Sequence, residues 1–209
     1  MSRWPERNES AITVGFAFRM VADSSAEDAE EIVMTPTLSR MTALTDDPML
    51  VRKTFAHFPS GVSFLSAERD DHKHALVASS FMVGVSLEPC LVAFAVQKSS
   101  ETWPLLRDAE RIGVSVAGEG QADLTRKLAG RDRARRFEEV SHSVEESGAV
   151  FIDGAALWLE CSVYSESDAG DHWLVLLEVR DLGMNDIEPL VWHGSRFRGL
   201  ALESSVDVE

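Results

Sequence analysis

Basic residues are scarce in this sequence relative to acidic ones. Its 209 residues include 20 Lys and Arg against 35 Asp and Glu, which gives a formal net charge of -15. A surface of this sign repels a phosphate backbone and anionic lipid headgroups, which argues against general nucleic-acid binding and a polybasic membrane mode. No apolar run approaches the roughly 20 residues of a membrane span. The opening MSRWPERNES lacks the apolar core of a signal peptide, so we expect a cytoplasmic protein.

Cysteine is almost absent, and several catalytic signatures are missing. Cys90 and Cys161 lie in apolar, strand-like surroundings without a C-x-x-C motif, so we expect free buried thiols in a reducing compartment. No G-x-S-x-G elbow occurs, which disfavours a serine hydrolase. Residues 118–123 follow a predicted strand but lack the third glycine of a dinucleotide turn, and we interpret them as an ordinary strand-to-helix connection.

Sustained hydrophobic periodicity is missing from the first 45 residues. They contain a run of acidic and small residues at 23–31, and we expect residues 1–45 to be a flexible acidic extension. Residues 46–203 are expected to form one folded domain, which is long enough to bury a sizeable core. Residues 204–209 are expected to be a tail.

The pattern of the domain is mainly that of β-strands. A helix is predicted first, where an Asp cap and Pro48 precede apolar residues at helical spacing up to Phe58. Two more short helices are predicted at 103–108 and 121–128. Short strands joined by tight turns and so few helices favour an antiparallel barrel over a doubly wound sheet. The predicted strands cover residues 62–67, 75–80, 90–96, 112–116, 156–164, 173–179 and 189–193, with a hairpin tip at 70–72 and a loop at 167–171.

The most informative stretch runs from Val77 to Thr102. It contains two hydroxyl-rich turns, Ser79-Ser80 and 99–102, which flank what we predict to be a buried strand pair. Clustered hydroxyl and backbone N–H donors can hold a phosphate with few formal positive charges. Lys98 adds a local positive charge beside the second turn.

Three groups of basic and histidine residues have competing interpretations. Six Lys and Arg crowd residues 126–136, either as a solvated helix face or as a landing site for an anionic cofactor. His72 and His74 are two apart, but without a third nearby ligand an exposed hairpin is favoured over a metal site, and we predict no metal. His172 follows Asp171 at the mouth of a predicted strand, where the carboxylate can fix its tautomer or raise its basicity; a purely structural histidine is the alternative.

Taken together, the order of the motifs resembles the flavin reductase family. The resemblance covers residues from about 50 to 200. The segments that carry it, in chain order, are FAHFPSGV (55–62), ASSF (78–81), VSLEP (85–89), KSSET (98–102), GA (154–155), LEC (159–161), GDH (170–172), EV (178–179) and PLV (189–191).

The resemblance implies a fold, cofactors and partners. The expected fold is mainly β, an antiparallel split β-barrel of the Greek-key, FMN-binding type with a few short helices, assembled as a homodimer. NADH or NADPH would reduce FMN or FAD, and the reduced flavin would pass to a partner monooxygenase. The catalytic residue implied is His172, near the nicotinamide. The cofactor-binding residues implied are Val77, Ala78, Ser79, Ser80, Phe81, Lys98, Ser99, Ser100, Thr102, Arg136, Phe137 and Asp171.

Two positions depart from the family pattern. Val77 stands where the family commonly has Thr, which removes a hydroxyl worth on the order of 1 kcal/mol of flavin affinity. Glu88-Pro89-Cys90 stands where Asp-Pro-Pro is common, a milder change in a turn. Three other functions stay open: a flavin-binding protein without reductase activity, a reductase of a corrinoid or ferric complex, and an interaction module whose acidic extension recruits a basic partner.

Overall fold

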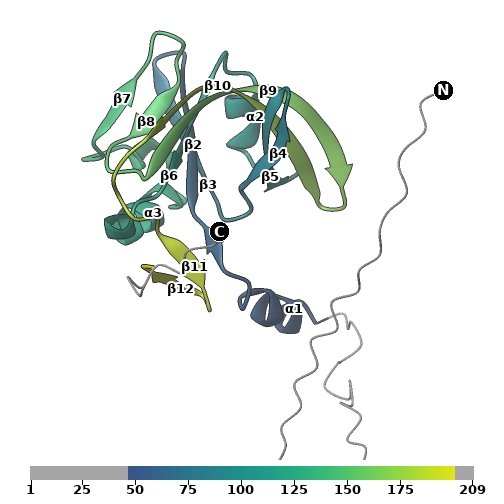
Figure 1. Cartoon of the computed structure of the whole chain (residues 1–209). Helices are drawn as coiled ribbons and strands as arrows, with labels where there is room; N and C mark the ends of the chain where they lie inside the picture. The colour runs from purple at the N-terminus through teal and green to yellow at the C-terminus, as the bar shows by residue number, and fades with distance from the viewer. Residues whose placement is uncertain (1–46, 201–209) are drawn as a thin grey trace, which may run out of the picture. The chain divides into compact units, whose positions relative to one another are not determined.

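The computed structural model describes residues 47–200. The predicted extension (1–45) and tail (204–209) therefore lie outside the described residues. Within 47–200 no helix is both long and apolar enough to cross a membrane. The domain is mainly β with few helices, as predicted (Figure 1).

Within residues 47–200 the chain forms twelve strands and five short helical segments. The helices are α1 (Pro48–Phe55), α2 (Trp103–Arg107) and α3 (Ala122–Leu128), with the 3-10 turns η1 (Glu119–Gln121) and η2 (Arg133–Arg135). The strands are β1 (Ser60–Gly61), β2 (Ser63–Arg69), β3 (His72–Ala78), β4 (Met82–Leu87), β5 (Cys90–Gln97), β6 (Ile112–Val116), β7 (His142–Val144), β8 (Val150–Ile152), β9 (Leu157–Ala169), β10 (His172–Met184), β11 (Val191–His193) and β12 (Arg196–Arg198).

Seven strands form one antiparallel sheet in the order β3-β2-β6-β9-β10-β5-β4. The sheet curls, and one side chain links the end strand β3 to β5, the strand next to the other end. Ser80, just after β3, donates its hydroxyl to the Ala95 carbonyl of β5 at 2.9 Å and accepts the Ala95 N–H at 3.0 Å. No strand ladder connects β3 to β5, so between these strands the sheet stays open.

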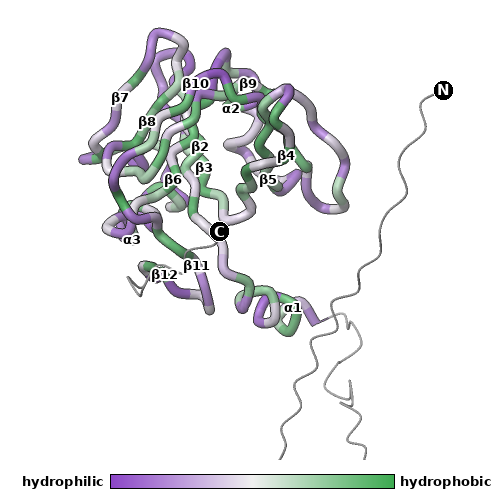
Figure 2. Tube along the Cα trace, viewed as in Figure 1, coloured by the Kyte–Doolittle hydropathy of each residue, from purple (hydrophilic) through white to green (hydrophobic). Residues whose placement is uncertain are grey.

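Two hydrophobic clusters cover the two faces of the curled sheet, because successive residues of a strand point to opposite sides. On β2, Leu65 belongs to a cluster with Phe94, Trp103 and other buried residues, whereas its neighbour Phe64 belongs to a second cluster with Leu128. Figure 2 shows the corresponding apolar colouring along the central strands. The α2 helix contributes to the first cluster and α3 to the second.

The predicted helices form for local reasons. The Asp47 side chain accepts the Met49 N–H at 2.9 Å and caps α1, with Pro48 in its first position. None of the residues of α1 is buried by the part of the chain that the structure describes, residues 47–200. The connection after β6 is an ordinary strand-to-helix turn, as predicted: the Gln121 side chain accepts the Gly118 N–H at 2.9 Å.

Three sequence expectations need correction. Residues 167–171 are not a loop: β9 and β10 pair up to Ala169 and His172, so only Gly170 and Asp171 form the turn. The strand pair between the hydroxyl turns is only half buried, since β4 is an exposed edge strand. Cys161 is a buried free thiol, where burial raises its pKa to about 12, but Cys90 is exposed.

Candidate functional site

A cleft opens where the sheet fails to close. We call it the serine cleft; its volume is about 360 Å³, within the range of small-molecule sites. Its lining comes from the end of β3 and the turn after it, the end of β5 and the start of β10. The lining residues are Leu76, Val77, Ala78, Ser79, Ser80, Ala95, Val96, Gln97, Ser100 and His172. The structure thus brings together six of the predicted site residues, although they lie up to 95 positions apart (172 − 77 = 95).

The hydroxyl groups at the cleft differ in whether they already have a hydrogen-bond partner within the protein. The Ser80 hydroxyl is occupied by the Ala95 backbone on the opposite side of the cleft. The Ser79 hydroxyl has no hydrogen-bond partner within the described part of the chain and is exposed. The Ser100 hydroxyl accepts the Trp103 N–H at 3.2 Å and keeps its own proton to donate. Ser79 and Ser100 are therefore the side chains that can donate to an anionic ligand, whereas Ser80 holds the rim in shape.

His172 lies at the edge of this cleft with a fixed ring orientation. Its Nδ1–H donates to the Asp171 carboxylate at 2.7 Å. The hydrogen bond to His172, followed by the charge of that ring, lowers the pKa of Asp171. Because the carboxylate can only accept a hydrogen bond, Nε2 is the nitrogen left to meet a ligand. The expected contact between Asp171 and His172 is thus present.

Lys98 is held against the same hairpin tip. Its ammonium lies 2.5 Å from the Asp168 carboxylate and 5.0 Å from the centre of the Trp173 ring. Its backbone N–H donates to the Asp171 carbonyl at 3.0 Å. The hydrogen bond and charge of Lys98 lower the pKa of Asp168, so the stabilisation from this ion pair is complete above the ordinary carboxylate pKa and is lost as the pH falls through the lowered pKa. Lys98 thus fastens the end of β5 to the turn that carries His172.

Arg136 lies beside the cleft, behind the second hydroxyl turn. Its Nη1 donates to the Ala75 carbonyl at 2.6 Å and to the Thr102 hydroxyl at 3.3 Å, and its Nε donates to the Gly130 carbonyl at 2.9 Å. Burial lowers the pKa of Arg136, followed by the charge of Arg133. Thr102 is buried, so both residues support the turn and do not line the cleft.

Four more predicted residues lie outside the lining. Ser99 is exposed in the second hydroxyl turn, and Phe81 packs partly against the first hydrophobic cluster. Phe137 lines a different cavity, and Asp171 acts through His172. The residues that the sequence analysis did not identify are Leu76, Ala95, Val96 and Gln97; they lie in or next to the predicted strands 75–80 and 90–96, whose position beside the hydroxyl turns was the available signal.

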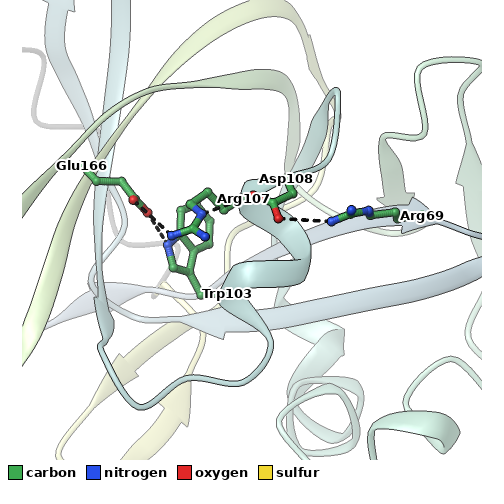
Figure 3. A network of polar contacts seen from close by, with 5 residues as sticks. All are labelled: Arg69, Trp103, Arg107, Asp108 and Glu166. Carbon is green, nitrogen blue, oxygen red and sulfur yellow. Dashed lines mark hydrogen bonds and ion pairs between the residues drawn. The ribbon is translucent and has the colours of Figure 1, made fainter.

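A buried tryptophan ties the second hydroxyl turn to the long hairpin. The Trp103 indole N–H donates to the Glu166 carboxylate of β9 at 2.5 Å, and Arg107 lies 3.7 Å from the same carboxylate (Figure 3). Arg107 also meets Asp108, which reaches Arg69 at 3.4 Å. The network links α2 to β9 and β2 beside residues 98–102, and the sequence contained no local signal for it.

The site has the means to bind and orient a ligand. Free hydroxyls, apolar walls and one oriented imidazole can hold an anionic tail and a flat ring. Within residues 47–200 no cluster of His, Cys, Asp and Glu is arranged to hold a metal ion. The redox chemistry of such a site would come from its ligands.

Comparison with known proteins finds relatives that share one family. Residues 55–201 match the model of the flavin reductase like domain. A flavin reductase of Pseudomonas putida is 28% identical over 169 residues, which cover 80% of this chain and 99% of that protein. The reductase subunit of a flavin-dependent monooxygenase from Mycobacterium tuberculosis is 27% identical, over 76% of this chain and 86% of that protein. The structure of a Streptomyces globisporus NADH:FAD oxidoreductase with NAD and FAD fragments matches with a TM-score of 0.73 and 31% identity, covering 78% of this chain and 100% of that one.

Proposed function

The chain belongs to the flavin reductase like domain family, and from this premise we propose how its residues serve the reaction. It is an NAD(P)H-dependent flavin reductase that supplies reduced flavin to a partner monooxygenase. The observation that carries the proposal is the serine cleft, where free hydroxyls and the fixed His172 ring face one space of about 360 Å³. A flavin bound in this cleft would supply the two-electron chemistry, with NAD(P)H as the reductant.

The residues of the cleft divide this work. Ser79 and Ser100 would hold the ribityl and phosphate groups of FMN or FAD through their hydroxyls, and Ser99, outside the lining, would add a donor from the same turn. Leu76, Val77 and Val96 would give the apolar wall. His172 would orient the nicotinamide through Nε2, because Asp171 holds its Nδ1. Thr102 and Arg136 would support the second hydroxyl turn from the side away from the cleft. Val77 offers no hydroxyl at the position where the family commonly has Thr.

We also propose the finer architecture and assembly. The open seam between β3 and β5, linked by the two hydrogen bonds of Ser80, supports a split barrel. The edge strand β4 exposes apolar side chains, including 53% of Met82 and 88% of Leu87, and α1 exposes 71% of Phe55. Apolar surface on an unpaired edge is a liability unless something covers it. This surface supports a homodimer in which a second copy packs against it.

The function is tested by NADH and NADPH oxidation, followed by absorbance, with no flavin and with added FMN, FAD or riboflavin. We expect little oxidation without flavin and oxidation that saturates as flavin is added, because the flavin is a substrate. Flavin binding without oxidation would instead identify a flavin-binding protein that is not a reductase. Oxidation that needs a ferric or corrinoid acceptor would identify the other alternative. If the protein shows no flavin binding and no NAD(P)H oxidation, the assignment is rejected.

Two roles compete for Lys98, and one pair of substitutions separates them. We propose that Lys98 positions His172 through Asp168. Lys98→Met and Asp168→Asn should then each raise the Michaelis constant for NADH about threefold, the effect of one exposed ion pair. The double variant should raise the Michaelis constant for NADH no more than either single substitution does. The flavin dissociation constant should not change. If Lys98 binds the flavin phosphate, Lys98→Met alone will weaken flavin binding and Asp168→Asn will not.

A further inference from the structure

Two carboxylates of β9 reach the two ends of the second hydroxyl turn. Asp168 pairs at 2.5 Å with Lys98, which precedes the turn. Glu166 accepts the indole N–H of Trp103, which follows the turn, at 2.5 Å. Because alternate residues of a strand point to the same side, Glu166 and Asp168 lie on one face of β9. The turn is therefore attached to the β9–β10 hairpin at both ends.

The Glu166 carboxylate is placed to hold the Trp103 ring in one orientation. Only 21% of the Glu166 side chain is exposed, and Nη1 of Arg107 lies 3.7 Å from the same carboxylate (Figure 3). Trp103 is 2% exposed, and its ring packs edge-on against Phe94 with ring centres 5.2 Å apart. The hydrogen bond to Glu166 adds a direction to this packing, because it forms in only one of the two ring orientations that χ2 allows.

The backbone of Trp103 continues this contact to the serine cleft. Its N–H donates to the Ser100 hydroxyl oxygen at 3.2 Å. The oxygen of that hydroxyl acts as the acceptor, so its proton points away from Trp103. Ser100 lines the cleft, whereas Trp103 and Glu166 do not. Two hydrogen bonds in series thus join Glu166 to a hydroxyl group of the cleft.

We propose that Glu166 is a positioning residue for the flavin phosphate: through Trp103 it holds the Ser100 hydroxyl in the orientation that donates to this group. The inference rests on the proposed reductase function, in which Ser100 binds the flavin tail. Asp168, on the same face of β9, acts instead on His172 through Lys98. The two carboxylates therefore serve different ligands of one cleft, Glu166 the flavin tail and Asp168 the nicotinamide.

Equilibrium titration of the full chain with FMN and with riboflavin tests the proposal without turnover. Riboflavin lacks the phosphate, so the ratio of its dissociation constant to that of FMN isolates the contribution of the phosphate. We expect Ser100→Ala to lower this ratio about tenfold, the loss of one hydrogen bond to a charged group. Glu166→Gln should lower it about threefold, because the hydroxyl remains but is less well oriented. A purely structural role of Glu166 would weaken the binding of both flavins equally and leave the ratio unchanged.

A matched control and a double variant make the test specific. Glu68→Gln is the same change at another half-buried carboxylate, which pairs with Lys73 at 3.3 Å and does not line the cleft, so the ratio should not change. If Glu166 acts through Ser100, adding Glu166→Gln to Ser100→Ala changes the ratio no further, because no hydroxyl is left to position. Additive losses in the double variant would overturn the proposal.

The remaining outcomes show which inference fails. Trp103→Phe removes the indole N–H from the other side of the contact and should lower the ratio as Glu166→Gln does. An unchanged ratio in both variants, with a lowered ratio in Ser100→Ala, would overturn the positioning role and leave the reductase function in place. An unchanged ratio in Ser100→Ala would remove Ser100 from the phosphate site and overturn the positioning role with it. A chain that binds neither flavin would reject the proposed function and the positioning role together.

Discussion

Alanine in place of His172 is expected to lower kcat/KM for NADH by about 10- to 30-fold, with the flavin dissociation constant changed by less than about twofold. Asp171 holds Nδ1 at 2.7 Å, so Nε2 is the nitrogen that faces a ligand at the edge of the serine cleft. If His172 orients the nicotinamide as we propose, removing the ring takes away one hydrogen bond and one packing surface from it. The flavin tail, which we propose the serines hold, would keep its contacts.

Stopped-flow reduction of the flavin and equilibrium flavin titration measure the two quantities separately. Asp171→Asn should give a smaller loss than His172→Ala, because the ring remains but its orientation is less fixed. Asp70→Asn is the matched control: it makes the same change in the β2–β3 turn, which does not line the serine cleft. Equal reduction rates in His172→Ala and the unmodified chain would exclude the role in orientation. A large loss of flavin affinity would place His172 among the flavin ligands instead.

The elements that could be predicted from the sequence are those with strong local patterns. Residues 112–116 form a buried strand because their apolar content is high, and β6 has those same bounds. The α1 helix starts at Pro48 because its cap lies next to it in the chain. The hydroxyl turns could be recognised because five Ser and Thr residues fall near one strand pair. Each signal depends on neighbours in sequence, which propensity rules capture.

The features that could not be predicted depend on residues far apart in the chain. Trp103 and Glu166 are 63 positions apart, and Lys98 and Asp168 are 70 apart. Nothing near Lys98 in the sequence indicates that its ammonium is already paired, and a phosphate contact was the natural expectation. The double role of Ser80 as donor and acceptor to Ala95 likewise requires the curl of the sheet.

The long hairpin shows a third kind of failure. Residues 165–169 are polar and small, which is typical of a loop, yet they continue β9 because β10 pairs with them up to Ala169. Ladder hydrogen bonds to β10 outweigh the weak local preference of these residues. The extension places His172 at the serine cleft.

A methyl group added at Gly113 is expected to destabilise the domain by about 3 kcal/mol, or about 10 °C in Tm. The β8 strand crosses β6 so closely that a Cβ on Gly113 would lie 2.2 Å from the Val150 carbonyl oxygen and 2.9 Å from its nitrogen. Both are backbone atoms, so no side-chain rotation relieves the clash. To move away, β8 would give up the hydrogen bond from the Ile152 N–H to the Ser115 hydroxyl at 3.0 Å.

Urea and thermal unfolding of Gly113→Ala measure this cost, with Gly120→Ala as the matched control. A Cβ on Gly120 meets no atom within 4 Å, so that substitution should change the unfolding free energy by less than about 0.5 kcal/mol. Because β8 lies away from the serine cleft, Gly113→Ala should keep its flavin affinity below the unfolding transition. Equal unfolding midpoints for the two variants would mean that β8 does not pack on β6 as closely as described. A loss of flavin affinity in the folded Gly113→Ala protein would mean that this packing also sets the shape of the cleft.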